Sequence, residues 1–140
     1  MITLEGANSL IALLFKRAGE LSLKPLAVAV FDAGGHLVSA QRQDGASTGR
    51  LQIATGKAKG SLFLGMSSRA VADMASQRPS FVASLGSMVS DGLVPAPGGL
   101  LIADGQGRRI GAIGVSGDTS DNDETCAADA ITAAGLFVAT

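Results

Sequence analysis

The sequence has 140 residues, a formal net charge of −1, 46% hydrophobic residues and 16% charged residues. This length suits one domain over residues 1–140, and the composition excludes a disordered chain. The basic residues are scattered, no apolar run reaches the ~18 residues of a membrane span, and the first twenty residues lack the basic start of a signal peptide. We therefore expect a cytoplasmic protein that binds neither nucleic acid nor membranes.

Apolar residues at helical spacing predict a first helix, which starts near Leu4 and stops at Gly19. The short run 26–31 is apolar on both faces and predicts a buried strand. The turn sequence "DAGG" follows, and residues 37–42 then predict a second strand.

A second unit of the same form lies near the C-terminus. Residues 100–103 and 110–116 predict two strands around the turn sequence "DGQG". Mostly helical sequence separates the two strand–turn–strand units, and terminal helices bracket them. This order predicts an α+β fold with an antiparallel sheet.

The predicted helix 48–64 has two unlike faces. Leu51, Ala54, Ala58 and Leu62 share one face, and the glycines lie opposite. Because an exposed helix back is normally polar, the bare glycine face predicts a second partner, which could be a subunit, another helix or a flat ligand. We favour a homo-oligomer with this face at a contact. The glycines of this face are Gly49, Gly56 and Gly60.

The segment "GAIGVSGDTSDNDETCAADAI" at 111–131 combines glycines, acidic residues and the only cysteine. Its glycine spacing matches neither a dinucleotide fingerprint nor a P-loop, and its acidic residues match no EF-hand register. We expect the acidic run to serve the N-terminus of the last helix, with Thr119, Ser120 or Asp121 as the cap. The alternative is that Asp123 lines a ligand pocket. Cys126 is expected to be a buried structural thiol.

Other single residues leave alternatives open. His36 is the only histidine, so a multi-histidine metal site is excluded, but the residue could be solvated, ligate haem iron or act as a base. Lys57 could be a surface lysine or a charge directed at a ligand carboxylate. Arg42 could pair with Asp44. Phe81, Met88 and Leu93 precede a rigid turn, "PAPGG" at 95–99, and these apolar residues could line a pocket mouth or fill the core.

Four segments together resemble the GlcG/HbpS-like family, which also occurs as the C-terminal domain of PduO-type cobalamin adenosyltransferases. They are "AVFDAGGHLVSAQRQDGA" (29–46), "IATGKAKGS" (53–61), "PGGLLI" (97–102) and "IGAIGVSG" with "DNDETCA" (110–127). They cover nearly the whole chain in order. Leu101 stands where the family often has proline.

The resemblance implies a profilin-like fold, in which an antiparallel sheet of about five strands is flanked by helices. It also implies symmetric assembly, often to octamers, and the binding of haem or a corrinoid by several members. We therefore expect a haem or tetrapyrrole carrier or sensor, and regard an enzyme as less favoured. The alternatives are an enzyme or accessory protein acting on a small carboxylate or ketone, with Lys57, His36 or Asp123 supplying charge or proton transfer, and an assembly module without chemistry.

For the haem hypothesis we expect a groove near the glycine helix and the turn 95–99. His36 is the candidate iron ligand, and the alternatives are Cys126, a methionine, a hydroxyl or no protein ligand. Arg42, Arg50 and Lys57 are candidate partners for the propionates. The full set of candidate ligand-binding residues is His36, Arg42, Gly56, Lys57, Gly60, Phe81, Pro97, Gly98, Gly99 and Asp123.

Overall fold

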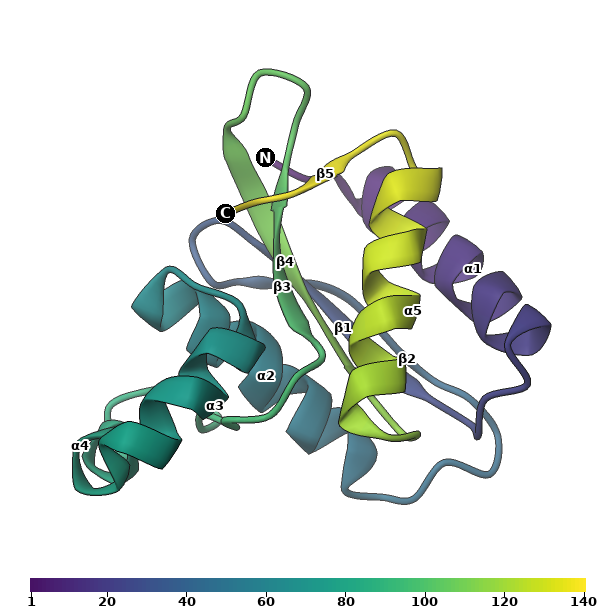
Figure 1. Ribbon diagram of the computed structural model, residues 1–140. Helices are drawn as coiled ribbons and strands as arrows, with labels where there is room; N and C mark the ends of the chain where they lie inside the picture. Colours follow the sequence, from purple (N-terminus) through teal and green to yellow (C-terminus); the bar gives the residue numbers. More distant parts are fainter.

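A computed structural model describes all residues from 1 to 140 and shows one five-stranded antiparallel sheet with the strand order β2-β1-β4-β3-β5 (Figure 1). The α+β fold class expected from the sequence is confirmed. The helices and strands, in chain order, are α1 (Leu4–Glu20), β1 (Ala27–Asp32), β2 (Leu37–Arg42), α2 (Arg50–Leu64), α3 (Ser68–Gln77), α4 (Pro79–Leu85), β3 (Gly99–Ala103), β4 (Arg109–Ser116), α5 (Ser120–Ala133) and β5 (Phe137–Val138).

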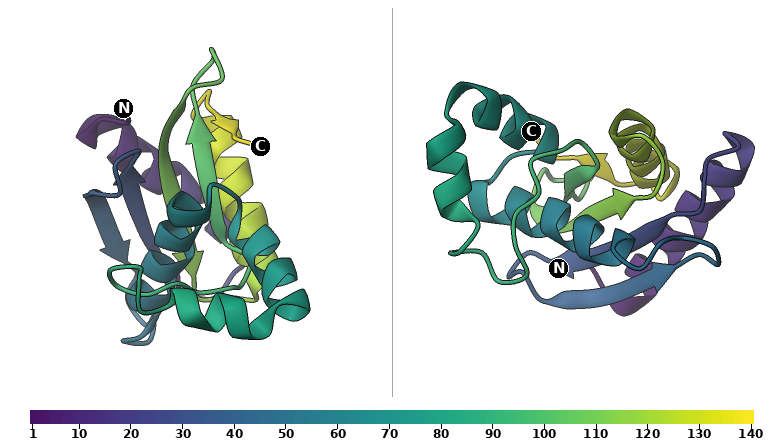
Figure 2. Two further views of the ribbon diagram at one scale, coloured as in Figure 1. Left: turned by 90° about the vertical axis from the view of Figure 1, so that its left-hand side faces the viewer. Right: turned by 90° about the horizontal axis from the view of Figure 1, so that it is seen from below.

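The helices lie on both faces of the sheet. Helices α1 and α5 cover one face, α2 crosses the other, and α3 and α4 lie beyond α2 (Figures 1 and 2). Alternating side chains of β1 serve the two layers. Val28 and Val30 join the large core beneath α1 and α5, whereas Ala29 and Phe31 join a smaller cluster beneath α2.

The N-terminal helix forms where the apolar periodicity places it. The Thr3 hydroxyl accepts a hydrogen bond from the backbone N–H of Gly6 at 3.0 Å and so caps α1. Leu10, Ile11 and Leu14 recur on one face and are fully buried in the large core. None of the helices is both long and apolar enough to cross a bilayer.

Helix α2 lies unusually close to the sheet because small residues face one another across the contact. A Cβ atom at Gly114 would overlap the carbonyl oxygen of Ala54, and one at Gly99 would overlap the carbonyl oxygen of Lys57. Glycine is therefore required at these two strand positions to let the helix backbone approach. This contact fixes the height of α2 above the sheet and hence the position of every side chain that α2 carries.

The glycine face of α2 is where the structure differs most from the expectation. Gly56 is covered by Val94 and Gly60 by Leu93, both from the segment before β3, and the backbone N–H of Val94 donates to the carbonyl of Gly56 at 3.2 Å. The close partner of these two glycines is thus the chain itself. At Gly56 and Gly60 the expectation of a neighbouring subunit is corrected, because the segment 93–94 already covers them, whereas Gly49 has open space beside it.

Candidate functional site

An open groove runs along the outward side of α2. Its smaller part, of about 270 Å³, lies between the β1–β2 turn, the C-terminal half of α2 and residues 88–90. Its larger part, of about 1000 Å³, follows the N-terminal half of α2 beside Phe31 and Leu37. Lys59 lines both parts, so we treat them as one feature and call it the outer groove.

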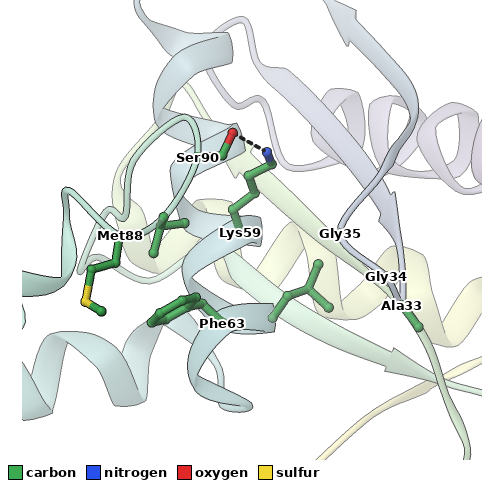
Figure 3. A pocket seen from close by; sticks show the side chains of 9 residues that line it. Ala33, Gly34, Gly35, Lys59, Phe63, Met88 and Ser90 are labelled. Carbon is green, nitrogen blue, oxygen red and sulfur yellow. Dashed lines mark hydrogen bonds between the residues drawn. The ribbon is translucent and has the colours of Figure 1, made fainter.

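The lining of the outer groove is mainly apolar around one basic residue. Leu37, Phe63 and Met88 expose much of their side chains there. Figure 3 shows Lys59 and Phe63 projecting from α2, with Met88 on one side and the turn 33–35 on the other. Pockets for small molecules combine apolar walls with a few polar groups that orient the ligand, and this groove has that character.

Lys59 is held at the centre of the groove. Its Nζ donates to Asp91 Oδ2 at 2.8 Å and contacts Ser90 Oγ at 3.4 Å, and it lies 5.6 Å from the centroid of the Phe31 ring. Lys59 was not among the site residues predicted from the sequence. The available signal was its spacing from Phe63, because residues four apart lie on the same side of a helix.

Lys57, one of the site residues predicted from the sequence, lies on the opposite side of α2 and is buried. Its Nζ donates to the carbonyl of Val115 at 2.8 Å and to Asp123 Oδ2 at 3.2 Å. The two side chains are 2% and 1% exposed. Burial lowers the pKa of Lys57, and the nearby Asp123 carboxylate opposes that shift. The alternative of a surface lysine is therefore wrong, because Lys57 forms an internal ion pair with Asp123.

Three further candidates pack around this buried pair. Gly98 has φ of +128°, and a Cβ there would meet Lys57 Nζ and the carbonyl of Val115. The N–H of Gly99 donates to Ser68 Oγ at 2.6 Å, and both glycines are buried. Pro97 precedes them and is partly buried. The turn 95–99 therefore closes the sheet side of α2, away from the Lys59 side chain.

The remaining candidates lie at separate places on the surface. The His36 side chain is 82% exposed beside the β1–β2 turn, with Nδ1 3.4 Å from Asp32 Oδ1. Arg42 donates to the carbonyl of Ala46 at 2.8 Å and so supports the loop after β2. Phe81 on α4 stacks beneath Arg78, whose guanidinium lies 4.0 Å from the ring centroid.

The ten sequence candidates therefore do not form one site. His36 follows the end of β1 at which Asp32 pairs with Gly111, whereas Lys57 contacts Val115, which pairs with Val28 near the other end. Four residues of strand separate these levels, or roughly 13 Å at 3.3 Å per residue. This separation keeps His36 apart from the Lys57–Asp123 pair within the single chain.

The acidic run at the start of α5 makes helix-terminal contacts. The Thr119 hydroxyl accepts from the N–H of Asn122 and caps the helix, while Asp123 Oδ1 accepts from the N–H of Asp118 at 3.0 Å. Asp118 accepts from the N–H groups of Lys24 and Thr119 and from the Asn122 amide, which together lower its pKa to about 2. No three acidic, histidine or cysteine side chains converge as a metal site.

The cysteine is buried in the large core, as its alanine-rich surroundings suggested. Cys126 Sγ lies 3.4 Å from the carbonyl oxygen of Leu14. Burial raises the pKa of the thiol to about 11, which keeps it protonated near neutral pH. Cys126 is thus a packing residue between α1 and α5.

The family model and the solved structures that match this protein each cover most of the chain. The family model described as "Haem degrading protein HbpS-like" matches residues 2–132. A crystal structure of a PduOC–heme complex superposes with a TM-score of 0.84 at 23% identity, covering 97% of this chain and 96% of that one.

Two other crystal structures have the same fold. The Klebsiella pneumoniae protein ORFY gives a TM-score of 0.80 at 28% identity, covering 94% of this chain and 91% of its own. HbpS gives 0.79 at 23% identity, with coverages of 94% and 88%. No curated protein matches the sequence significantly. With a family model that spans almost its full length, the chain belongs to the HbpS-like family.

Proposed function

We propose that this protein binds haem in the outer groove and acts as a homo-oligomeric haem carrier or sensor. The observation that carries the proposal is the groove itself, which combines exposed Leu37, Phe63 and Met88 with a single basic residue, Lys59. A tetrapyrrole has a broad apolar face and carboxylates at one edge, so its chemistry suits such a lining. Membership of the HbpS-like family and the heme-bound PduOC neighbour support the same ligand.

The groove offers few groups that could reach iron. His36 follows Gly34 and Gly35, which line the smaller part of the groove, and its exposed imidazole lies beside Gly34, although His36 itself does not line the groove. Met88 supplies a thioether on the opposite wall (Figure 3). Imidazole and thioether are both known axial ligands of haem. We retain His36 as the proposed ligand and add Met88 as the second candidate. When bound, haem would supply redox chemistry and ligand binding at its iron.

The direct test is a titration of haem into the wild type, His36→Ala and Met88→Leu, followed by the Soret band. We expect saturable binding by the wild type. A shifted Soret maximum in only one of the two variants would identify the ligand, while identical spectra in all three would discard both residues. Absence of saturable binding by the wild type would refute the haem proposal.

We propose the homo-oligomer, an assembly of up to eight chains, on separate grounds. Several large apolar side chains remain exposed on the single chain, which leaves apolar surface to be covered. Light scattering at micromolar concentration tests this, and a clean monomer near 13.9 kDa would contradict it. Outside the outer groove, the exposed apolar residues are Met1, Leu4, Phe81, Phe137 and Val138.

A further inference from the structure

Lys59 is a cation that the fold has already placed in the outer groove. Its side chain is only 16% exposed, and its ammonium group sits over the Phe31 ring between the two parts of the groove. Its stem is therefore packed and its charged end is positioned before any ligand arrives. Binding to such a preorganised group loses little side-chain entropy, which favours an anionic ligand at this point.

The present partner of Lys59 is held weakly. Asp91 accepts the 2.8 Å hydrogen bond from Lys59, yet its own side chain is 63% exposed. Water can solvate such a carboxylate almost as well as the lysine does, so the pair contributes little net stability. An incoming carboxylate could therefore replace Asp91 at small cost.

The segment that carries Asp91 is anchored without that ion pair. Val89 is buried on one side of Asp91, and Leu93 and Val94 pack on Gly60 and Gly56 on the other. Between these anchors the backbone turns through positive φ, with +66° at Asp91 and +89° at the following glycine. Asp91 can thus release Lys59 while the segment stays attached to α2.

We infer that Lys59 binds a carboxylate of the ligand. Asp91 pairs with Lys59 when no ligand is bound, and the ligand carboxylate displaces it. The site then selects apolar ligands that carry a carboxylate edge over neutral ones of the same shape. Asp91 lowers the affinity for those ligands and keeps Lys59 paired when the groove is empty. This inference deepens the proposed function and rests on it.

The test uses haem and its dimethyl ester as two probes of the same shape. Both are titrated into the wild type, Lys59→Met, Lys59→Arg and Asp91→Asn, with Soret absorbance as the readout. Lys16→Met and Asp73→Asn remove the same charges from exposed positions on α1 and α3 and serve as controls. Circular dichroism verifies that each variant is folded.

We expect Lys59→Met to bind haem about tenfold more weakly, as loss of one charge-assisted hydrogen bond predicts, and Lys59→Arg to recover most of the affinity. Asp91→Asn should bind haem about threefold more tightly, since it removes a weak competitor. The dimethyl ester should bind the wild type and Lys59→Met equally, because it offers no carboxylate.

Three results overturn the inference while leaving haem binding intact. They are unchanged haem affinity in Lys59→Met, weaker haem binding in Asp91→Asn, and an equal loss for haem and its ester in Lys59→Met. Failure of the proposed function looks different, because then neither probe shows saturable binding to the wild type or to any variant.

Discussion

Lys57 and Lys59 stand two residues apart on α2 and have opposite environments. Lys57 points toward the sheet and is fully enclosed with Asp123, whereas Lys59 points into the outer groove and holds a largely exposed Asp91. Both make one ion pair and one further polar contact. The two pairs differ in the exposure of the carboxylate. The buried Asp123 depends on Lys57 for its charge compensation, whereas Asp91 is 63% exposed and water solvates it without Lys59. One side of α2 therefore stabilises the fold, and the other is free for a ligand.

The largest expected effect comes from removing the buried lysine. Lys57→Met leaves the Asp123 carboxylate enclosed without its partner, which should lower the free energy of unfolding by about 3–5 kcal/mol. Lys59→Met is the matched control on the same helix and should cost no more than about 1 kcal/mol. Urea denaturation at pH 7 measures both. Equal costs would refute the contrast between the two sides.

Replacing a glycine by alanine should also cost different amounts of stability on the two sides of α2. Gly114→Ala places a methyl group against the backbone of Ala54, which cannot yield without lifting the helix, and we expect a loss of about 3 kcal/mol. Gly56→Ala meets the end of the Val94 side chain, Cγ2, at 2.6 Å, and this methyl group can rotate away while the backbone stays in place, so about 1 kcal/mol is expected. Thermal melting of both variants is the measurement, and the reverse order would show that the segment 93–94 is the more rigid contact.

Asp118 is hydrogen-bonded to the buried Lys57–Asp123 pair, because its N–H donates to the Asp123 carboxylate. Its own carboxylate accepts three hydrogen bonds. Its folded pKa of about 2 lies below the ordinary value of 3.8, so its stabilisation is complete above pH 3.8 and is lost as pH falls toward 2. After a discount for solvent screening, the stabilisation from the Asp118 carboxylate is about 1 kcal/mol. Asp118→Asn should lose that amount at neutral pH and show a flatter acid limb. An unchanged acid limb would mean that other carboxylates control acid unfolding.

The smallest effect is expected on the groove side. Asp91→Asn should leave the urea midpoint at pH 7 unchanged, because Asp91 is exposed and the segment around it is anchored by Leu93 and Val94. The Lys59 ammonium lowers the pKa of Asp91, so the pair persists above the ordinary carboxyl pKa and is lost only in acid. A clear fall in midpoint would show that this ion pair holds the segment in place.

The local features of the fold could be predicted from the sequence because their causes are local. The strand at Leu37–Arg42 has the predicted bounds, and α1 starts at the predicted residue, since periodicity and turn residues act over a few positions. Thr119, one of three expected caps, bonds to a residue three positions along. The short strand β5 had no such signal, because two residues are too few to show a period.

The sequence by itself determined the fold class and the family resemblance, and it indicated that the glycines of α2 need a close partner. Only the tertiary structure decided what each side of α2 contacts. Lys57 meets Asp123 across 66 positions, and Lys59 meets Asp91 across 32. Spacing within one helix places the two lysines on different sides, but it does not tell which side is buried from solvent. That depends on how the sheet, α5 and the segment 93–94 pack around the helix, and so the choice between a structural lysine and a ligand-binding one belongs to the assembled fold.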